Sequence, residues 1–436
     1  MNYSLKATLF LVFAAVSIVL IEREDQRKTF DPYNRSFLDW LVGNAWTRIA
    51  PSQVTLLRVN PKELEQDNLD PRLDWAIILR SLETFDPKSV AIVPSLNWDK
   101  PDQLAEGALN KRVISMPPLT LGATFGAPGQ GAPNLDVSKM TALTDLTGDL
   151  SQLPVVRNIV AMPDPELLAN GKAAFTQIEL NEETASGPNG IRFPLLAKVG
   201  DKVVPSFVLQ VIMHQEDIPA DQVKVILEGP RPIIRLGKHT VPVDRDGCFT
   251  VYHGMKGSFP SLEFSSLALA ASPFEEVAEK LRKASKESIE SLRTNAVIIG
   301  YDQEEMKEFA LPTGERISRA ELIAMAVATI QTGRHITYWP DLFRYASWAL
   351  LAVLGLALFR ARRFRVFSGA LAILLLYGGV SIAIFQTSLS WTPPWSALGI
   401  CAVLLVLGIL LPSPKRKLSP IKPDPQEPPS EEASGS

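Results

Sequence analysis

Four apolar runs stand out along the chain, and together they predict a membrane protein. The first is Ala7–Ile21, and the others are Tyr345–Phe359, Val366–Phe385 and Trp395–Leu411. A helix rises about 1.5 Å per residue, so roughly 20 apolar residues cross a bilayer. Val366–Phe385 meets that length without a charge. The pattern therefore predicts four transmembrane helices, one N-terminal over residues 1–21 and three within residues 341–411.

The run Ala7–Ile21 has two interpretations, a cleaved signal peptide or an uncleaved anchor. Charged residues begin directly after it, at Glu22, and the nearest small-residue cleavage pattern is Ala15-Val16-Ser17. Because cleavage there leaves too little apolar length in front of the site, we favour the anchor.

Basic residues of the short loops predict the orientation. Arg360–Arg365 holds four arginines and Lys415–Lys417 is wholly basic, whereas Thr387–Pro394 carries no charge. Since cytoplasmic loops are enriched in Lys and Arg, Arg360–Arg365 and the C-terminus are expected in the cytoplasm. Thr387–Pro394 and residues 22–340 are then expected outside.

Apolar runs and helical spacing alternate through residues 22–340. Val54–Val59 and Val90–Val93 are predicted strands, and Asp74–Phe85 between them has apolar residues at the spacing of an amphipathic helix. Gln103–Leu109 is expected as a short helix and Arg112–Met116 as a third strand. This order predicts an α/β domain with a mostly parallel mixed sheet, flanked by helices and joined by right-handed crossovers.

The later part of this segment continues the alternation. Leu119–Leu150, rich in glycine and proline, and the polar Asn181–Asn189 are predicted loops. Gly237-Lys238 and Asp244–Gly247 are predicted hairpin turns. The expected strands are Val155–Ala161, Val223–Leu227, Ile233–Leu236, His239–Val243, Cys248–Tyr252 and Ala296–Ile299. The expected helices are Pro205–His214, Phe274–Leu292 with Phe274 and Val277 facing inward, and Arg319–Thr332 closed by Gly333.

Composition and charge exclude several classes of protein. The 436 residues are 46% hydrophobic and 21% charged, with a net charge of −3. Roughly 320 residues outside the apolar runs suffice to bury a core, so a wholly disordered or fibrous chain is excluded. A nucleic-acid binder is not expected, since it would carry a basic domain or stripe. The proline-rich residues 412–436 hold very few apolar side chains and are predicted to be a disordered cytoplasmic tail.

No catalytic, cofactor-binding or metal-binding constellation is evident. The four histidines form no HExxH or close pair. Asp244–Gly247 begins like a calcium loop, but Met255 stands at position twelve, so a turn is favoured. Cys248 is expected to be a buried apolar side chain. The apolar runs hold no carboxylate or histidine, which disfavours a transporter. We therefore expect no enzyme, no cofactor and no metal, and the ligand-binding residues stay unknown.

Several segments together resemble the type-two CHASE domain, an extracellular sensory domain of cyclases and histidine kinases. The first is the strand from Ala50 to Asn60, with the proline-arginine motif of Asp70–Ala76 and the helix and strand of Leu79–Ala91 after it. Val241–Gly247 with Gly257–Phe264 resembles a later region of the family. The last similarity is the strand Ala296–Gly300 followed by the helix of Ile317–Gly333. The resemblance covers most of residues 22–340 and extends to the apolar runs that follow.

Three positions depart from the family pattern. Asn60 stands where an acidic residue is expected after the first strand, Pro94-Ser95 replaces the acidic end of the second, and Tyr301-Asp302 lacks the usual small residues. The resemblance implies a bacterial inner-membrane protein with a sensory domain outside the membrane.

Two hypotheses follow from the architecture. The first is a sensor or receptor subunit that responds to an envelope or small-molecule signal and passes it to a separate effector. The alternative is a non-sensing envelope scaffold that uses a degenerate sensory domain for docking. Expected partners are the lipid bilayer, a separate cytoplasmic kinase or cyclase or envelope proteins, and further copies of the chain.

Overall fold

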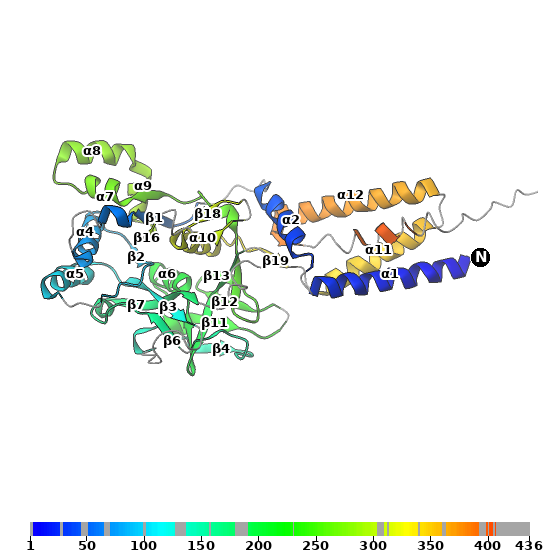
Figure 1. The fold of residues 1–436 in the computed structure, drawn as a ribbon, viewed down its shortest axis with the longest axis horizontal. Helices are drawn as coiled ribbons and strands as arrows, with labels where there is room; N and C mark the ends of the chain where they lie inside the picture. The colour runs from blue at the N-terminus through cyan, green and yellow to red at the C-terminus, as the bar shows by residue number, and fades with distance from the viewer. Residues whose placement is uncertain are drawn as a thin grey trace, which may run out of the picture. The chain divides into compact units, whose positions relative to one another are not determined.

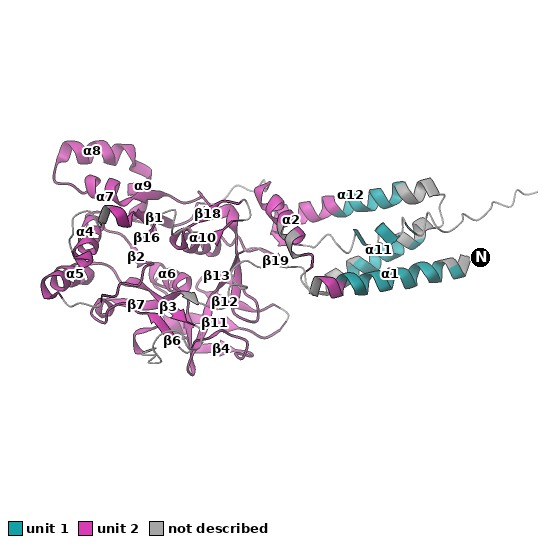
Figure 2. Ribbon diagram, viewed as in Figure 1, with its two compact units in different colours: residues 1–21, 345–377, 395–436 teal, residues 22–344, 378–394 magenta. Residues whose placement is uncertain are grey.

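The computed structural model describes residues 3–26, 29–44, 51–64, 70–98, 102–126, 137–156, 158–178, 191–229, 231–302, 309–311, 314–338, 341–359, 363–391, 398–399, 401–403 and 406. The chain divides into two compact units, coloured separately in Figure 2. Unit 1 contains Met1–Ile21, Tyr345–Tyr377 and Trp395–Ser436, and unit 2 contains Glu22–Arg344 and Gly378–Pro394.

Unit 2 is built on a seven-stranded, mostly parallel sheet (Figure 1). The strand order is β15-β1-β16-β2-β3-β6, and β7 also pairs with β3. The β3–β6 pairing is antiparallel and the other pairings are parallel. The strands are β1 (Val54–Val59), β2 (Ser89–Ile92), β3 (Leu119–Gly126), β6 (Asn158–Ala161), β7 (Gly171–Ile178), β15 (Ser261–Glu263) and β16 (Ala296–Tyr301). The predicted α/β fold with a mostly parallel sheet is confirmed.

Helices cover both faces of this sheet. Leu57 and Val59 of β1 share a core with one group of helices, whereas Val54 and Leu56 share a core with the other. Strands buried on both faces carry continuous apolar runs, which explains why β1, β2 and β16 were predictable. The first group is α4 (Pro71–Glu83), α5 (Gln103–Ser115), α7 (Phe264–Ala270) and α9 (Lys286–Leu292), and the second is α6 (Phe207–Gln215) and α10 (Arg319–Gln331).

The strand predicted at Arg112–Met116 is wrong, because α5 continues to Ser115. The Asp102 carboxylate caps this helix by accepting hydrogen bonds from the first backbone N–H groups. Val113 then lies on the buried face of α5. The third strand is instead β3, at the start of Leu119–Leu150, so the loop prediction fails there.

Gly122 explains that error. A Cβ atom at Gly122 would lie 2.0 Å from the carbonyl oxygen of Val93, at the end of β2. The glycine therefore permits the close approach of two chain segments inside a sheet, a role that sequence does not distinguish from a loop glycine. Residues 127–136 of the predicted loop lie outside the described residues.

Capping residues fix the other helix boundaries. The helix predicted at Asp74–Phe85 is α4, which begins earlier because the Asp70 side chain accepts from the Arg72 N–H and Pro71 occupies the first turn. Ser206 and Ser318 cap α6 and α10 in the same way. Gly333, with φ of +66°, follows the end of α10, as predicted.

The long helix predicted at Phe274–Leu292 is two helices. α8 (Glu275–Ala284) and α9 meet at Ser285. Leu292 is buried as expected, but Phe274 and Val277 are 74% and 43% exposed, so their predicted inward orientation is wrong. The break at Ser285 divides the apolar stripe, and α9 carries the buried part of it.

Smaller sheets complete unit 2. The turn at Gly237-Lys238 joins two antiparallel strands, as predicted. Asp244–Gly247 is a tight turn, closed by a hydrogen bond from the Gly247 N–H to the Asp244 carbonyl. The predicted hairpin is nevertheless wrong, because β13 pairs with β12 and β14 pairs with β8. The strands of these smaller sheets include β4 (Asp145–Thr147), β5 (Val155–Val156), β8 (Ile191–Pro194), β9 (Leu196–Val199), β10 (Lys202–Pro205), β11 (Val223–Ile226), β12 (Ile233–Leu236), β13 (His239–Pro242) and β14 (Cys248–Val251).

Two further predictions in this region have different outcomes. The single strand predicted at Val155–Ala161 is divided, because β5 pairs with β9 while β6 joins the central sheet. The predicted loop Asn181–Asn189 lies outside the described residues.

Unit 1 consists of apolar helices. α1 (Tyr3–Gln26) and α11 (Asp341–Phe359) contain the first two apolar runs, and α12 (Arg363–Ser388), whose first part belongs to unit 1, contains the third. Phe10 of α1, Leu351 of α11 and Ile373 of α12 share a buried cluster.

One helix in the described part of the chain is long and apolar enough to span a membrane. It covers Ser368–Ser388 of α12, with a mean hydropathy of 2.1. The other three predicted spans stay predictions. Trp395–Leu411 lies largely outside the described residues, and the predicted tail at 412–436 lies wholly outside them.

Candidate functional site

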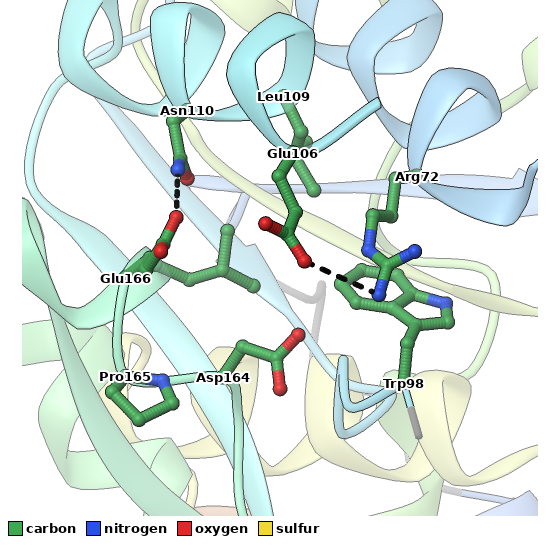
Figure 3. Close-up of a pocket in the computed structure, with 9 residues that line it drawn as sticks. Arg72, Trp98, Glu106, Leu109, Asn110, Asp164, Pro165 and Glu166 are labelled. Atoms are coloured by element: carbon green, nitrogen blue, oxygen red, sulfur yellow. Dashed lines mark hydrogen bonds and ion pairs between the residues drawn. The ribbon is translucent and has the colours of Figure 1, made fainter. Parts of the chain in front are cut away.

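A cavity of about 230 Å³ lies beyond the carboxyl end of β2 (Figure 3). It is formed by the first turn of α4, the segment after β2, the first half of α5 and the segment after β6. Ligand sites of parallel α/β sheets commonly lie outside the carboxyl ends of strands. The lining residues are Arg72, Trp98, Glu106, Leu109, Asn110, Asp164, Pro165, Glu166 and Leu167.

Arg72 is the buried cation of this cavity, with a side chain only 3% exposed. Its Nη1 atom lies 2.9 Å from Oδ2 of Asp70, and its Nη2 atom lies 3.6 Å from Oε1 of Glu106. The guanidinium also lies 5.1 Å from the centre of the Trp98 ring. Two carboxylates and an indole therefore hold Arg72 in one position, in a cation–π arrangement with Trp98.

Two further carboxylates, Asp164 and Glu166, line the cavity. Burial raises the pKa of Asp164, and the negative charges of Glu106 and Glu166 raise it further. The positive charge of Arg72 and a hydrogen bond from the backbone N–H of Trp98 lower it. The Asn110 amide donates a hydrogen bond to Glu166. In Figure 3 the Glu106 and Asp164 carboxylates face the same central space. The cavity thus combines a fixed charge pattern with apolar walls from Leu109 and Leu167.

A second polar cluster lies at the carboxyl ends of β1 and β16. Arg58 Nε lies 3.5 Å from Oδ2 of Asp302, and its other nitrogens lie 3.9 Å from Glu263 and 4.0 Å from Glu321. Burial raises the pKa of Glu321. Asp302, one of the positions that depart from the family pattern, is an ion-pair partner of Arg58. Asn60 accepts the Lys62 N–H and so caps the next helical turn.

The turn Asp244–Gly247 binds a cation, but that cation is a side chain. Nη2 of Arg192 lies 2.8 Å from Asp244 and 2.7 Å from Asp246. Both carboxylates are thereby engaged in holding β8 to the turn. Within the described residues, no three His, Cys, Asp or Glu side chains gather closely enough to hold a metal ion.

Cys248 is held in an unreactive form. Burial raises the pKa of its thiol to about 12, and Asp246 raises it further. Because the thiolate is the nucleophile, this environment suits a structural cysteine. Cys248 is half-buried in β14, so it is less buried than the sequence analysis predicted.

Sequence reasoning missed the cavity of Figure 3. Its residues come from segments more than 90 positions apart, between Arg72 and Leu167, and their convergence depends on the strand order. The one available indication was the proline-arginine motif at Pro71-Arg72, whose arginine is the cation of the site.

Comparison with known proteins gives one match. The family model described as the CHASE2 domain matches residues 9–358, which is most of the chain. No curated protein and no solved structure matches.

Proposed function

The chain belongs to the CHASE2 family, and on that premise we propose that it is a membrane-anchored sensor. Unit 2 is the sensory domain in this proposal, and the cavity beside Arg72 receives the stimulus. A change in unit 2 then passes along α12 into the helices of unit 1. A rigid helix with side chains packed in both parts is one physical element that can carry such coupling.

The observation that carries the proposal is the position of the last part of α12. Residues 378–391 belong to unit 2, although the helix begins in unit 1. Phe385 is completely buried and Trp391 is 2% exposed, both in the core that contains α6 and α10. The candidate membrane helix is therefore anchored in the sensory core by its own side chains.

Contacts with α2 (Asp31–Gly43) and a short strand pair reinforce this anchor. The ring of Phe37 in α2 lies 5.6 Å from that of Trp391, and the Gln386 side chain donates to the Asn44 carbonyl at 3.0 Å. β19 (Thr337–Tyr338), which follows α10, pairs with β20 (Ser390–Trp391), which follows α12. A displacement of α10 therefore reaches the end of α12 through hydrogen bonds as well as packing.

The proposal includes a membrane topology. All four apolar runs cross the bacterial inner membrane, unit 2 lies outside, and the C-terminus lies in the cytoplasm. The arginines of Arg360–Arg365 support this orientation. The proposed recipient of the signal is a separate cytoplasmic kinase or cyclase, in keeping with the enzymes that such sensory domains serve. No catalytic role is proposed for this chain.

The envelope scaffold is the second candidate function. The departures from the family pattern favour it, because Asn60 and Pro94-Ser95 stand where the family has acidic residues. This candidate predicts partners in the envelope and no stabilising small molecule.

A melting-temperature screen with a reporter on α12 separates the two candidates. The full chain, with Cys248→Ser and Cys401→Ser, carries Arg363→Cys labelled with an environment-sensitive fluorophore. A sensor is stabilised by at least one compound of a small-molecule library, because a ligand of the native state raises its melting temperature. The same compound changes the fluorescence. Stabilisation without a fluorescence change contradicts transmission, and a screen without any stabilising compound favours the scaffold.

A further inference from the structure

The charge of the cavity beside Arg72 is not balanced by the residues that line it. Among the described residues that line it, Arg72 is the one basic side chain, against three carboxylates, Glu106, Asp164 and Glu166. The guanidinium is already paired with Asp70 and Glu106. Among the described residues, no ion pair within 4.0 Å joins Asp164 or Glu166 to a cation. The cavity is therefore electronegative on the side of these two residues.

This imbalance disfavours an anionic ligand. A ligand carboxylate would need donors, but both terminal nitrogens of Arg72 face protein carboxylates. Glu166 accepts from Asn110, whose amide is thereby engaged as well. An anion would lie among three like charges, whereas a cation would relieve the repulsion between Asp164 and its acidic neighbours.

The size and walls of the cavity distinguish an organic cation from a metal ion. Hard metal ions need several oxygen ligands that converge on one point, and the described residues show no such group. A volume of about 230 Å³ corresponds to roughly eight water molecules at about 30 Å³ each. Leu109, Pro165 and Leu167 contribute apolar surface between the charged groups. This suits a short hydrocarbon chain with a charged end.

We propose that the cavity binds a small aliphatic amine, whose ammonium group donates hydrogen bonds to Asp164 and Glu166. Its methylene groups pack on Leu109 and Leu167. Arg72 already lies over the Trp98 ring, so the ring is not expected to bind the ammonium group. The carboxylates therefore provide the selectivity for a positively charged ligand. This inference rests on the proposed sensory function, since it names the ligand class of the same site.

Three probes of equal chain length isolate the effect of charge. 1,4-Diaminobutane is cationic, 1,4-butanediol is neutral and succinate is anionic. Titration calorimetry on the full chain in nanodiscs is expected to give a dissociation constant for the diamine at least about tenfold below that of the diol. Succinate is expected not to bind. Equal binding of diamine and diol, or preferred binding of succinate, overturns the inference.

Variants locate the binding. Asp164→Asn and Glu166→Gln remove charge with little change of shape, and each is expected to weaken diamine binding at least about tenfold. Glu276→Gln, at an exposed position of α8, is the matched control and leaves binding unchanged. Glu166 is itself exposed, so Glu166→Gln tests the site even where Asp164→Asn fails to fold. Undiminished diamine binding in Glu166→Gln and Asp164→Asn contradicts the proposed site.

The failure of this inference is distinguishable from failure of the sensor proposal. Suppose that a compound other than an amine stabilises the chain and changes the fluorescence of the α12 reporter. The ligand class is then wrong and the sensory function stands. If the diamine binds as expected but the reporter does not respond, the ligand class stands and transmission through α12 is contradicted.

Discussion

Two half-buried histidines are expected to make unit 2 sensitive to acid. Burial lowers the pKa of His214 to about 4, and the nearby Lys172 lowers it further. Burial likewise lowers the pKa of His335 to about 4, with a contribution from His239. The Gln210 side-chain nitrogen lies 2.8 Å from Nε2 of His214, and the Thr120 hydroxyl lies 2.9 Å from Nδ1. Both ring nitrogens of the neutral imidazole therefore already have hydrogen-bond partners.

The sign of the effect follows from proton uptake. Because the folded-state pKa lies below the unfolded value of about 6.5, the unfolded chain binds protons first as the pH falls. The stability is therefore complete above about pH 6.5 and is lost as the pH falls towards 4. Each unit of pKa is worth about 1.4 kcal/mol, so at about pH 5 each histidine lowers the free energy of unfolding by about 2 kcal/mol.

Thermal or urea unfolding of the full chain at about pH 7.5 and about pH 5 measures this loss. Carboxyl groups with a raised pKa, such as Asp164 and Glu321, act in the opposite direction. The diagnostic quantity is therefore the difference between variants. His214→Gln and His335→Gln should each remove about 2 kcal/mol of the pH dependence. An unchanged pH dependence in the double variant would refute the reasoning.

Two pairs of substitutions test the packing of unit 2. Trp391→Ala should lower the free energy of unfolding of unit 2 by about 3–5 kcal/mol, because a buried ring leaves a cavity, whereas Trp40→Ala, at a half-exposed ring, should lower it by under about 1 kcal/mol. Gly122→Ala should destabilise by about 3 kcal/mol, since its Cβ meets the Val93 carbonyl, whereas Gly107→Ala, in open space on α5, should stabilise by about 0.5–1 kcal/mol. Urea unfolding measures all four. Equal effects within either pair would contradict the packing described.

The strands of the central sheet show which parts of the fold were predictable. β1, β2 and β16 are buried on both faces, so each appears in the sequence as an uninterrupted apolar run. β3 contains Gly122 and Gly126, and its glycines resemble those of a loop until the neighbouring Val93 carbonyl is known. The insertion of β16 between β1 and β2 depends on long-range pairing, which local patterns do not encode.

The candidate site was less accessible from the sequence than the fold. Arg72 and Asp164 approach the same cavity from separate crossovers, and nothing in their local sequence links them. The same applies to Phe37 and Trp391, which meet although more than 300 positions separate them. Apolar runs predict helices, but they do not indicate which helix is anchored in another core. The end of α12 was accordingly predicted only as a membrane segment.

In-cell crosslinking followed by co-purification tests the central claim most directly. The experiment compares four chains in the native host: the full chain, Trp391→Ala, Trp40→Ala and a chain truncated after Leu411. A sensor that signals through α12 should recover a cytoplasmic kinase or cyclase, and the yield should change in Trp391→Ala and in the truncated chain but not in Trp40→Ala. Recovery of envelope proteins alone, in equal amounts from all four chains, would contradict the sensory account.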